Sequence, residues 1–223
     1  MSKVIAFSLW GSDPKYCIGA IRNAELTRKI YPGWKCRFYV AEDVPQHIVN
    51  ELKQHTDEVI PMPPGMDGWR GMFARFLPAG EDEVDVFISR DCDSRLSERE
   101  AVAVQEWLDG PKLIHVMRDH PEHTAPIMGG MWGAKNGALP NLYAQLMGYI
   151  GGDFWQVDQN FLREVIWPAH YHKVLAHDDW VRFATASTKK FPTEREGDDF
   201  IGSIIGPNQE RLHPEHHEVF NAK

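Results

Sequence analysis

Residues 1–62 alternate short apolar runs with amphipathic segments, and this alternation restricts the fold more than any other feature of the chain. Three apolar runs of strand length lie at Val4–Leu9, Cys36–Val40 and Glu58–Met62. Between them, Ile18–Ile30 and Pro45–His55 carry apolar residues at roughly helical spacing. Strands that alternate with helices are typical of a parallel sheet covered by helices. We therefore predict an α/β fold with a central, mainly parallel sheet flanked by helices.

The rest of the chain continues this pattern. Val84–Ser89 is the best strand candidate and is expected at the centre of the sheet. The glycine-rich Met128–Ala134 fits a strand that a ligand or another backbone approaches closely. Further strands are predicted at Leu113–Met117 and Tyr171–Ala176, and helices at Trp69–Leu77, Ser97–Leu108, Leu139–Tyr149 and Phe154–Val165. These elements predict a single domain over residues 1–212 and a polar, mobile tail at residues 213–223.

Charge and composition exclude several classes of protein. The chain has 223 residues, 43% of them hydrophobic, which suffices for a sizeable core. Its formal net charge of -8 argues against non-specific binding to nucleic acid. Three cysteines without a CxxC pattern fit a reducing compartment. With no signal-peptide pattern and no apolar run of transmembrane length, we expect a cytoplasmic protein without a transmembrane segment or a nucleic-acid partner.

An acidic pair directly follows the predicted central strand. Asp91 and Asp93 stand one residue apart, just beyond Val84–Ser89. Ligands of open α/β sheets bind beyond the carboxyl ends of the strands. Two carboxylates at such a place can share one hard divalent cation. The pair is therefore a candidate metal site, with a solvated acidic turn as the alternative interpretation.

Other segments give the chain a resemblance to a known family. Asp91-x-Asp93 resembles the DxD motif of the GT-A class of nucleotide-sugar glycosyltransferases. Four segments match that class in order: FSLWGSDPKY, GMFARFL around Arg75, IMGGMWGAKNG and Asp158-Gln159. Within the class, the chain resembles the amino-terminal glycosyltransferase domain of a chlorella-virus glycan-building protein and its bacterial relatives, over about residues 4–165. The resemblance implies a GT-A (Rossmann-like) fold and a hexosyltransferase type of activity.

The resemblance also implies roles for individual residues. The donor is expected to be a nucleotide-sugar, with UDP as the family default, and the acceptor a glycan or another hydroxyl compound. A Mn²⁺ or Mg²⁺ ion would neutralise the departing diphosphate. Expected donor-binding residues are Phe7, Ser8, Leu9, Trp10, Tyr16, Arg75, Asp91, Gly129 and Gly130. Expected metal ligands are Asp91, Asp93 and His177, with His213, His216 and His217 as other candidates for the third ligand.

Asp158 and Gln159 are the expected catalytic residues. Asp158 would act as a base on the acceptor hydroxyl, stabilise positive charge on the sugar ring or position the acceptor. A carboxylate that merely favours a helix N-terminus is the alternative. Arg90 and Arg95 either add positive charge to the donor site or balance the neighbouring aspartates.

Aromatic and histidine-rich segments are further candidates for substrate contact. Trp10, Tyr16, Trp69 and Trp132 would stack on a base or sugar, or else belong to the core. The segment His115–His123 is expected to form an acceptor-facing loop.

Two other functions compete with the glycosyltransferase hypothesis. A nucleotidyltransferase acting on sugar phosphates would usually carry a glycine-rich basic loop after its first strand, whereas this chain has GSDPKYCIG there. A non-catalytic sugar-binding module would not need Asp91, Asp93 and Asp158 together.

Overall fold

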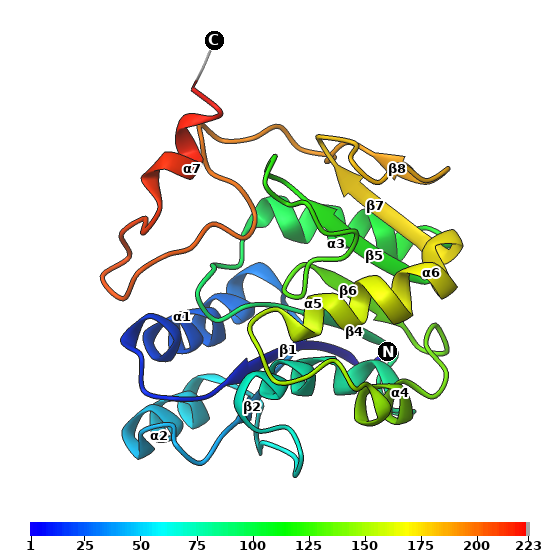
Figure 1. The fold of residues 1–223 in the computed structure, drawn as a ribbon. Helices are drawn as coiled ribbons and strands as arrows, with labels where there is room; N and C mark the ends of the chain where they lie inside the picture. The colour runs from blue at the N-terminus through cyan, green and yellow to red at the C-terminus, as the bar shows by residue number, and fades with distance from the viewer. Residues whose placement is uncertain (222–223) are drawn as a thin grey trace.

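A sheet of eight strands forms the centre of the computed structural model, which describes residues 1–221 (Figure 1). The strand order is β3-β2-β1-β4-β6-β5-β7-β8. Strand β6 runs antiparallel to its neighbours β4 and β5, and the other paired strands are parallel. The strands are β1 Lys3–Leu9, β2 Lys35–Val40, β3 Glu58–Pro61, β4 Val86–Ser89, β5 Ile114–Arg118, β6 Trp132–Lys135, β7 Val174–Asp178 and β8 Thr188–Lys189. This sheet confirms the predicted α/β fold.

Local signals explain where the main helices begin. Asp13 caps the first helix by accepting a hydrogen bond from the Lys15 backbone N–H, and Pro14 is its first residue. Ser97 caps another helix by accepting from Glu100 N, as its capping box predicts. The α-helices are α1 Pro14–Ile30, α2 Gln46–His55, α3 Glu98–Asp109, α4 Leu142–Gly148, α5 Val157–Phe161, α6 Trp167–His170 and α7 Pro214–Glu218. The 3₁₀ segments are η1 Gly68–Gly80 and η3 Tyr171–Lys173, and η2 Leu162–Ile166 is a π-helical turn that joins α5 to α6.

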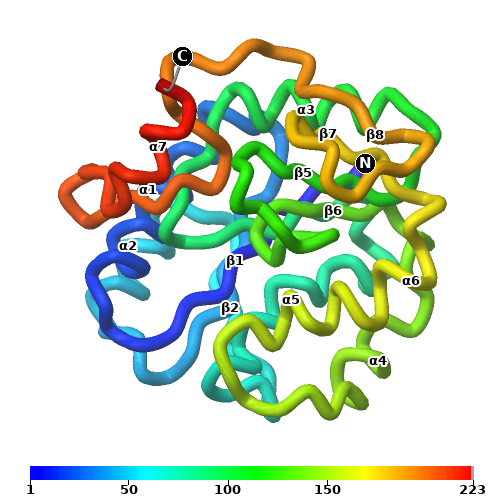
Figure 2. The backbone as a smooth tube through the Cα atoms, turned by 45° about the horizontal axis from the view of Figure 1, so that its top comes forward, coloured from blue at the N-terminus to red at the C-terminus, as the bar shows by residue number. Residues whose placement is uncertain are grey.

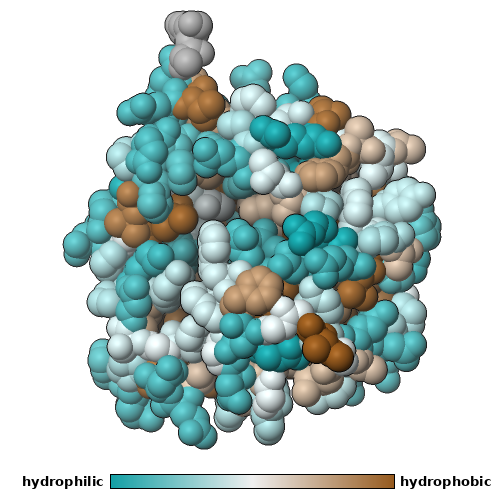
Figure 3. Space-filling model, viewed as in Figure 1, coloured by the Kyte–Doolittle hydropathy of each residue, from teal (hydrophilic) through white to brown (hydrophobic). Residues whose placement is uncertain are grey.

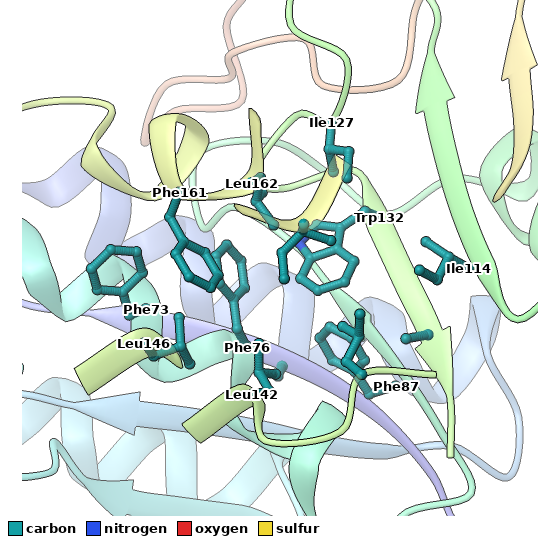
Figure 4. Packing of buried hydrophobic residues seen from close by; sticks show 14 of the residues in the cluster. Phe73, Phe76, Phe87, Ile114, Ile127, Trp132, Leu142, Leu146, Phe161 and Leu162 are labelled. Carbon is teal, nitrogen blue, oxygen red and sulfur yellow. The ribbon is translucent and has the colours of Figure 1, made fainter. Parts of the chain in front are cut away.

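Strand β1 supplies both layers of the hydrophobic core because its side chains alternate between the faces of the sheet. Val4 and Ala6 pack in the cluster that contains residues of η1, α4 and α5. Ile5 and Phe7 pack in the cluster that contains residues of α1, α2 and α3. Figure 2 shows α2 and α5 on opposite sides of β1. Figure 4 shows the first cluster, in which Phe73, Phe76, Phe87, Trp132 and Phe161 come together, several of them edge to face.

Several predicted elements differ from the structure. The strand predicted at Tyr171–Ala176 begins only at Val174, after a 3₁₀ turn, and the predicted acceptor-facing loop from His115 lies in strand β5 up to Arg118. The helix expected to end before Pro78 is a 3₁₀ segment that continues to Gly80 and contains Pro78. The glycine-rich stretch predicted as one strand is a loop up to Met131, and only Trp132–Lys135 enters the sheet. This loop precedes an antiparallel strand, so it lies at the same sheet edge as the carboxyl end of β4, where Ser89 pairs with Trp132.

The last part of the chain returns to the loop after β4. Ile205 N donates a hydrogen bond to Asp93 O (2.8 Å), and Arg95 Nε donates one to Gln209 Oε1 (3.1 Å). The predicted mobile tail contains α7, and its His217 is buried against Ser203 Oγ (2.9 Å). Residues 222–223 of that tail lie outside the described residues. The described end of the chain is therefore part of the folded structure near the acidic pair.

Figure 3 shows one face of the molecule, on which hydrophobic groups are separated by hydrophilic ones. Among residues 1–221, no helix combines the length and the apolar character needed to cross a membrane.

Candidate functional site

A cavity of about 460 Å³ opens at the carboxyl ends of β1 and β4. Leu9 and Trp10 line it from the end of β1, and Asp91 and Asp93 from the loop after β4. Gly129 and Gly130, on the loop before β6, line it from the same sheet edge. The cavity thus lies where ligands of open α/β sheets are expected.

An arginine joins two carboxylates inside this cavity. The Arg75 guanidinium donates through Nη1 to Asp91 Oδ1 and through Nη2 to Asp158 Oδ2 (2.6 Å). Asp158 is 1% exposed and Arg75 5%, whereas the Asp91 side chain is 42% exposed. Burial alone would lower the pKa of Arg75, but the charges of Asp91 and Asp158 raise it above its ordinary value. The Arg75 guanidinium is therefore a fixed cation between the half-exposed carboxylate of Asp91 and the buried carboxylate of Asp158.

The backbone that faces these acids has no room for side chains. A Cβ on Gly129 would collide with the Asp158 carboxylate and with Arg75 Nη2, and a Cβ on Gly130 would collide with the Asp91 carboxylate. Both glycines are needed because the loop and the acids come so close together. The groups that come close to Gly129 and Gly130 are thus side chains, whereas the sequence predicted the approach of another backbone or a ligand.

Asp93 provides a second acidic group with little opposing charge. Lys15 Nζ lies 3.6 Å from Asp93 Oδ2. Burial and the neighbouring charge of Asp91 raise the pKa of Asp93 to about 6. A carboxylate under these conditions is stabilised by an added cation, and oxygen ligands suit Mn²⁺ or Mg²⁺. The donor set of Asp91 and Asp93 therefore fits a hard divalent ion.

Asp158 lies where it can act on a ligand in the cavity. Burial raises the pKa of its carboxyl above the ordinary value, and the Arg75 charge opposes this shift. Its Oδ1 accepts a hydrogen bond from Gln159 N (2.8 Å), and Gln159 also lines the cavity. The structure thus brings the two residues expected to be catalytic to the same cavity as the acidic pair.

Most of the predicted donor-binding residues lie together. Leu9, Trp10, Tyr16, Gly129 and Gly130 all line the cavity. Ser8 lines it as well, and its Oγ accepts a hydrogen bond from Arg75 N (3.1 Å).

The Phe7 side chain does not reach the cavity. It stacks on Phe38 inside the core (4.6 Å between ring centroids), because the alternation of β1 directs it to the layer under α1 and α2.

His177 is also separate from the acidic pair. It lies on β7, three positions from β4 in the strand order, which corresponds to about 14 Å. Its Nδ1 is 2.7 Å from His115 Nε2 and its Nε2 is 2.9 Å from Glu106 Oε2, so both ring nitrogens are occupied. Among the other late histidines, His216 lines the cavity. The predicted ligand role of His177 therefore does not fit this structure, and His216 is paired with Glu122 (3.5 Å) rather than with the acidic pair.

Other candidates are structural. Arg90 is buried and donates through Nε to Glu100 Oε1 (3.0 Å), which also accepts from the Tyr31 hydroxyl (2.9 Å). Trp132 is fully buried between Phe76 and Phe87. Trp132 is thus a core residue, as its alternative stated, whereas Arg90 balances the core glutamate Glu100 and not the neighbouring aspartates.

Part of the cavity wall comes from the last quarter of the chain, in which only histidines were predicted as site residues. Phe200, Gly202 and Ile204 line it beside the loop that carries His120, whose ring centroid lies 4.5 Å from that of Phe200. This segment is held by the fully buried Asp119, which accepts hydrogen bonds from Ile201 N (3.0 Å) and from Arg99 and Arg195. Asp119 follows Arg118 in the sequence, and no neighbouring residue indicates that Arg195 and Ile201 are its partners. Further lining residues without a predicted site role are Lys15, Met72, Met128, Met131, Trp155 and Gln156.

Solved structures share this fold. A glycosyltransferase involved in the glycosylation of the major capsid of PBCV-1 aligns with a TM-score of 0.54 and 15% identity, over 80% of this chain and 82% of its own. S. aureus TarS 1-349 aligns with a TM-score of 0.52 and 12% identity over 80% of this chain, which spans 58% of the TarS chain. No protein-family model and no curated protein matches the sequence. The predicted GT-A, Rossmann-like fold is confirmed by these structures.

Proposed function

We propose that the protein is a metal-dependent glycosyltransferase that moves a sugar from a nucleotide-sugar donor, a UDP-sugar by family default, to a hydroxyl group of a glycan. One observation carries the proposal: Arg75 joins Asp91 to Asp158 in one cavity of a GT-A fold, and Asp93 lines the same cavity. A neighbour that shares this fold, the glycosyltransferase involved in the glycosylation of the major capsid of PBCV-1, supports the same reaction class.

The residues that would hold the metal are Asp91 and Asp93. Asp91 uses Oδ1 for Arg75 and retains Oδ2, while Asp93 has Lys15 as its neighbouring cation. His216 lines the same cavity, but its Nε2 lies 3.5 Å from Glu122 Oε2, and its ring is grouped with His213 and Glu215 rather than with the two aspartates. When bound there, a divalent cation supplies Lewis-acid neutralisation of the diphosphate that leaves with the nucleoside.

Arg75 and Asp158 would serve the transfer step itself. Arg75 fixes both carboxylates, so that Asp158 needs no reorganisation when charge develops. Because burial raises its pKa, Asp158 is a better proton acceptor than an exposed aspartate and suits a base on the acceptor hydroxyl. Stabilising positive charge on the sugar ring is the other role open to the same carboxylate.

Aromatic residues at the rim would bind the donor and exclude water. Trp10 and Trp69 meet edge to face (6.3 Å between ring centroids), and both line the cavity together with Tyr16. Such rings combine a large apolar area with a polar edge, which suits stacking on a base or a sugar.

A product analysis tests this proposal. The protein is incubated with UDP-, GDP-, CDP- and dTDP-sugars in Mn²⁺ and in EDTA, and released nucleotides are separated by chromatography. We expect nucleoside diphosphate release in Mn²⁺ that EDTA abolishes. Asp93→Asn should abolish the release of nucleoside diphosphate. Asp82→Asn should retain it, because Asp82 is an exposed acid elsewhere on the surface.

The other possible outcomes contradict the proposal. Formation of pyrophosphate from a nucleoside triphosphate and a sugar phosphate would identify a nucleotidyltransferase. Binding of a sugar without any nucleotide release would identify a non-catalytic sugar-binding module.

A further inference from the structure

A second cavity of about 380 Å³ continues from the first. The two cavities share Glu122, Met128, Gln156 and Gln159 as lining residues. Gln159 directly follows Asp158, the carboxylate at the proposed reaction centre. A ligand that extends beyond the first cavity therefore has a continuous path into the second.

One helical face forms a wall of this second cavity. Gln159, Asn160, Arg163 and Trp167 line it from α5, η2 and α6, and Gln156 lines it from the position just before α5. The opposite face of the same helix packs into the core through Val157, Phe161, Leu162 and Ile166. The π-helical turn η2 lies within this stretch, and such turns occur frequently at functional sites. Gln159, Asn160 and Trp167 are half-buried at this wall, whereas Gln156 and Arg163 are exposed, so the polar face borders a cavity that is open to solvent.

The amide side chains of this wall are suited to hydrogen bonds with hydroxyl groups. Gln156, Gln159 and Asn160 each offer a donor and an acceptor, the pairing that a sugar hydroxyl requires. At the far end, Trp167 and Phe183 meet at 70° with ring centroids 6.4 Å apart. Aromatic rings there offer apolar surface to the C–H face of a sugar.

The charges favour an uncharged ligand. Arg163 and Glu122 are the charged residues among those that line the second cavity. Arg163 Nη2 lies 3.1 Å from Glu164 Oε1, so its charge is already balanced. Glu122 stands at the junction of the cavities and repels an anion. An acidic polysaccharide or a phosphorylated acceptor is therefore disfavoured.

We propose that the second cavity is a subsite for a neutral oligosaccharide acceptor, binding the sugar units beyond the one that receives the transferred sugar. This inference rests on the proposed function, which places the transfer at Asp158. From Asp158 to Trp167 the helix rises about 14 Å, which is longer than a single sugar ring. The acceptor is thus an oligosaccharide rather than a free monosaccharide.

Binding measurements without donor or metal test the subsite. Maltotetraose, cellotetraose, chitotetraose and mannotetraose are titrated by calorimetry beside their monosaccharides. We expect at least one tetrasaccharide to bind about tenfold more tightly than its own monosaccharide, since each added hydrogen bond contributes a factor of about 2–10. No such preference in any of the four pairs overturns the inference.

Matched variants locate the binding. Asn160→Ala and Arg163→Ala should each weaken the preferred tetrasaccharide by about fivefold and leave its monosaccharide unchanged. Arg22→Ala is the control for Arg163→Ala, because both arginines are half exposed and pair with a nearby glutamate. Asn50→Ala on the surface of α2 is the control for Asn160→Ala. Equal losses in variants and controls, or tighter binding of an acidic oligosaccharide, contradict the assignment.

A parallel titration with UDP and Mn²⁺ separates this inference from the proposed function. Nucleotide binding without a preference for tetrasaccharides overturns the acceptor subsite alone. A preference for tetrasaccharides that Asn160→Ala removes, without binding of UDP, supports the subsite and contradicts the proposal of a UDP-sugar glycosyltransferase.

Discussion

Arg75 is the side chain on which the charge balance of the site depends. It is nearly inaccessible and donates to both Asp91 and Asp158, of which Asp158 is also buried. Removing one partner of a buried ion pair leaves an uncompensated charge, and the cost exceeds the net stabilisation by the intact pair. Arg75 therefore has a structural role besides any contact with a donor.

Arg75→Ala should lower the free energy of unfolding by about 3 kcal/mol, because Asp158 loses its counter-charge. Adding Asp158→Asn to this variant should recover at least about 1 kcal/mol, since the pair is coupled. Urea denaturation measures all members of the cycle, with Arg22→Ala as an exposed control expected within about 0.5 kcal/mol of wild type. Additive losses from the two substitutions would show that the pair is not energetically coupled.

Asp158→Asn should lower kcat by about 10²–10⁴-fold and leave donor affinity within about threefold, because the carboxylate acts mainly in the transition state. The substitution keeps the shape of the side chain and removes its charge. Asp109→Asn, on the exposed end of α3, is the matched control and should retain full activity. Full transfer by Asp158→Asn would identify the carboxylate as a structural partner of Arg75 only.

The site depends on two loops that meet at one sheet edge. The loop after β4 carries Asp91, and the loop before β6 brings Gly130 so close that a Cβ there would collide with the Asp91 carboxylate. The geometry of the acidic pair is therefore a property of loop spacing as well as of the aspartates.

Gly130→Ala tests this spacing. The added methyl group should displace the half-exposed Asp91 carboxylate and weaken binding of UDP with Mn²⁺ by about tenfold or more, with the protein still folded. Gly148→Ala is the control, because a Cβ there meets open space at the end of α4, and it should bind normally. Normal nucleotide binding by Gly130→Ala would mean that Asp91 is not needed in its observed position.

The sequence predicted the elements whose signals are local. Strand β1, the capped helix α3 and the acidic pair after β4 depend on nearby residues and were found where expected. The direction of β6 and the cavity wall at Phe200 depend on contacts between distant segments, which periodicity does not contain. His177 was placed wrongly for the same reason: its strand was predicted, but not that it lies beyond β5 with its side chain between His115 and Glu106.

The whole molecule buries several histidines, so its stability should depend on pH. Burial lowers the pKa of His123 to about 3, and burial also lowers the pKa of His115 and of His177. Below about pH 6.5, the unfolded chain binds protons that the folded protein excludes. Protonation of each such histidine therefore favours the unfolded chain. The free energy of unfolding is highest above about pH 6.5 and decreases as the pH falls toward the folded-state pKa.

His123→Asn should reduce this acid sensitivity. The Asn oxygen can accept the hydrogen bond that His123 Nδ1 accepts from Asp119 N (3.0 Å), and it does not titrate. Between about pH 6 and pH 4, the variant should lose less stability than wild type, by up to about 1.4 kcal/mol per pH unit. The exposed His47→Asn should leave the pH dependence unchanged when Tm is measured across this range. Identical pH profiles for wild type and His123→Asn would contradict the account.

For the whole chain, the proposal is that the acidic, arginine-fixed cavity of its GT-A fold binds a nucleotide-sugar through a metal. Calorimetric titration with UDP, GDP, CDP and dTDP, in Mn²⁺ and in EDTA, measures this directly. We predict that one nucleotide, UDP by family default, binds at least about tenfold more tightly in Mn²⁺, and that Asp93→Asn removes this difference. Equal affinity in Mn²⁺ and in EDTA, or no binding of any of the four, would contradict the claim.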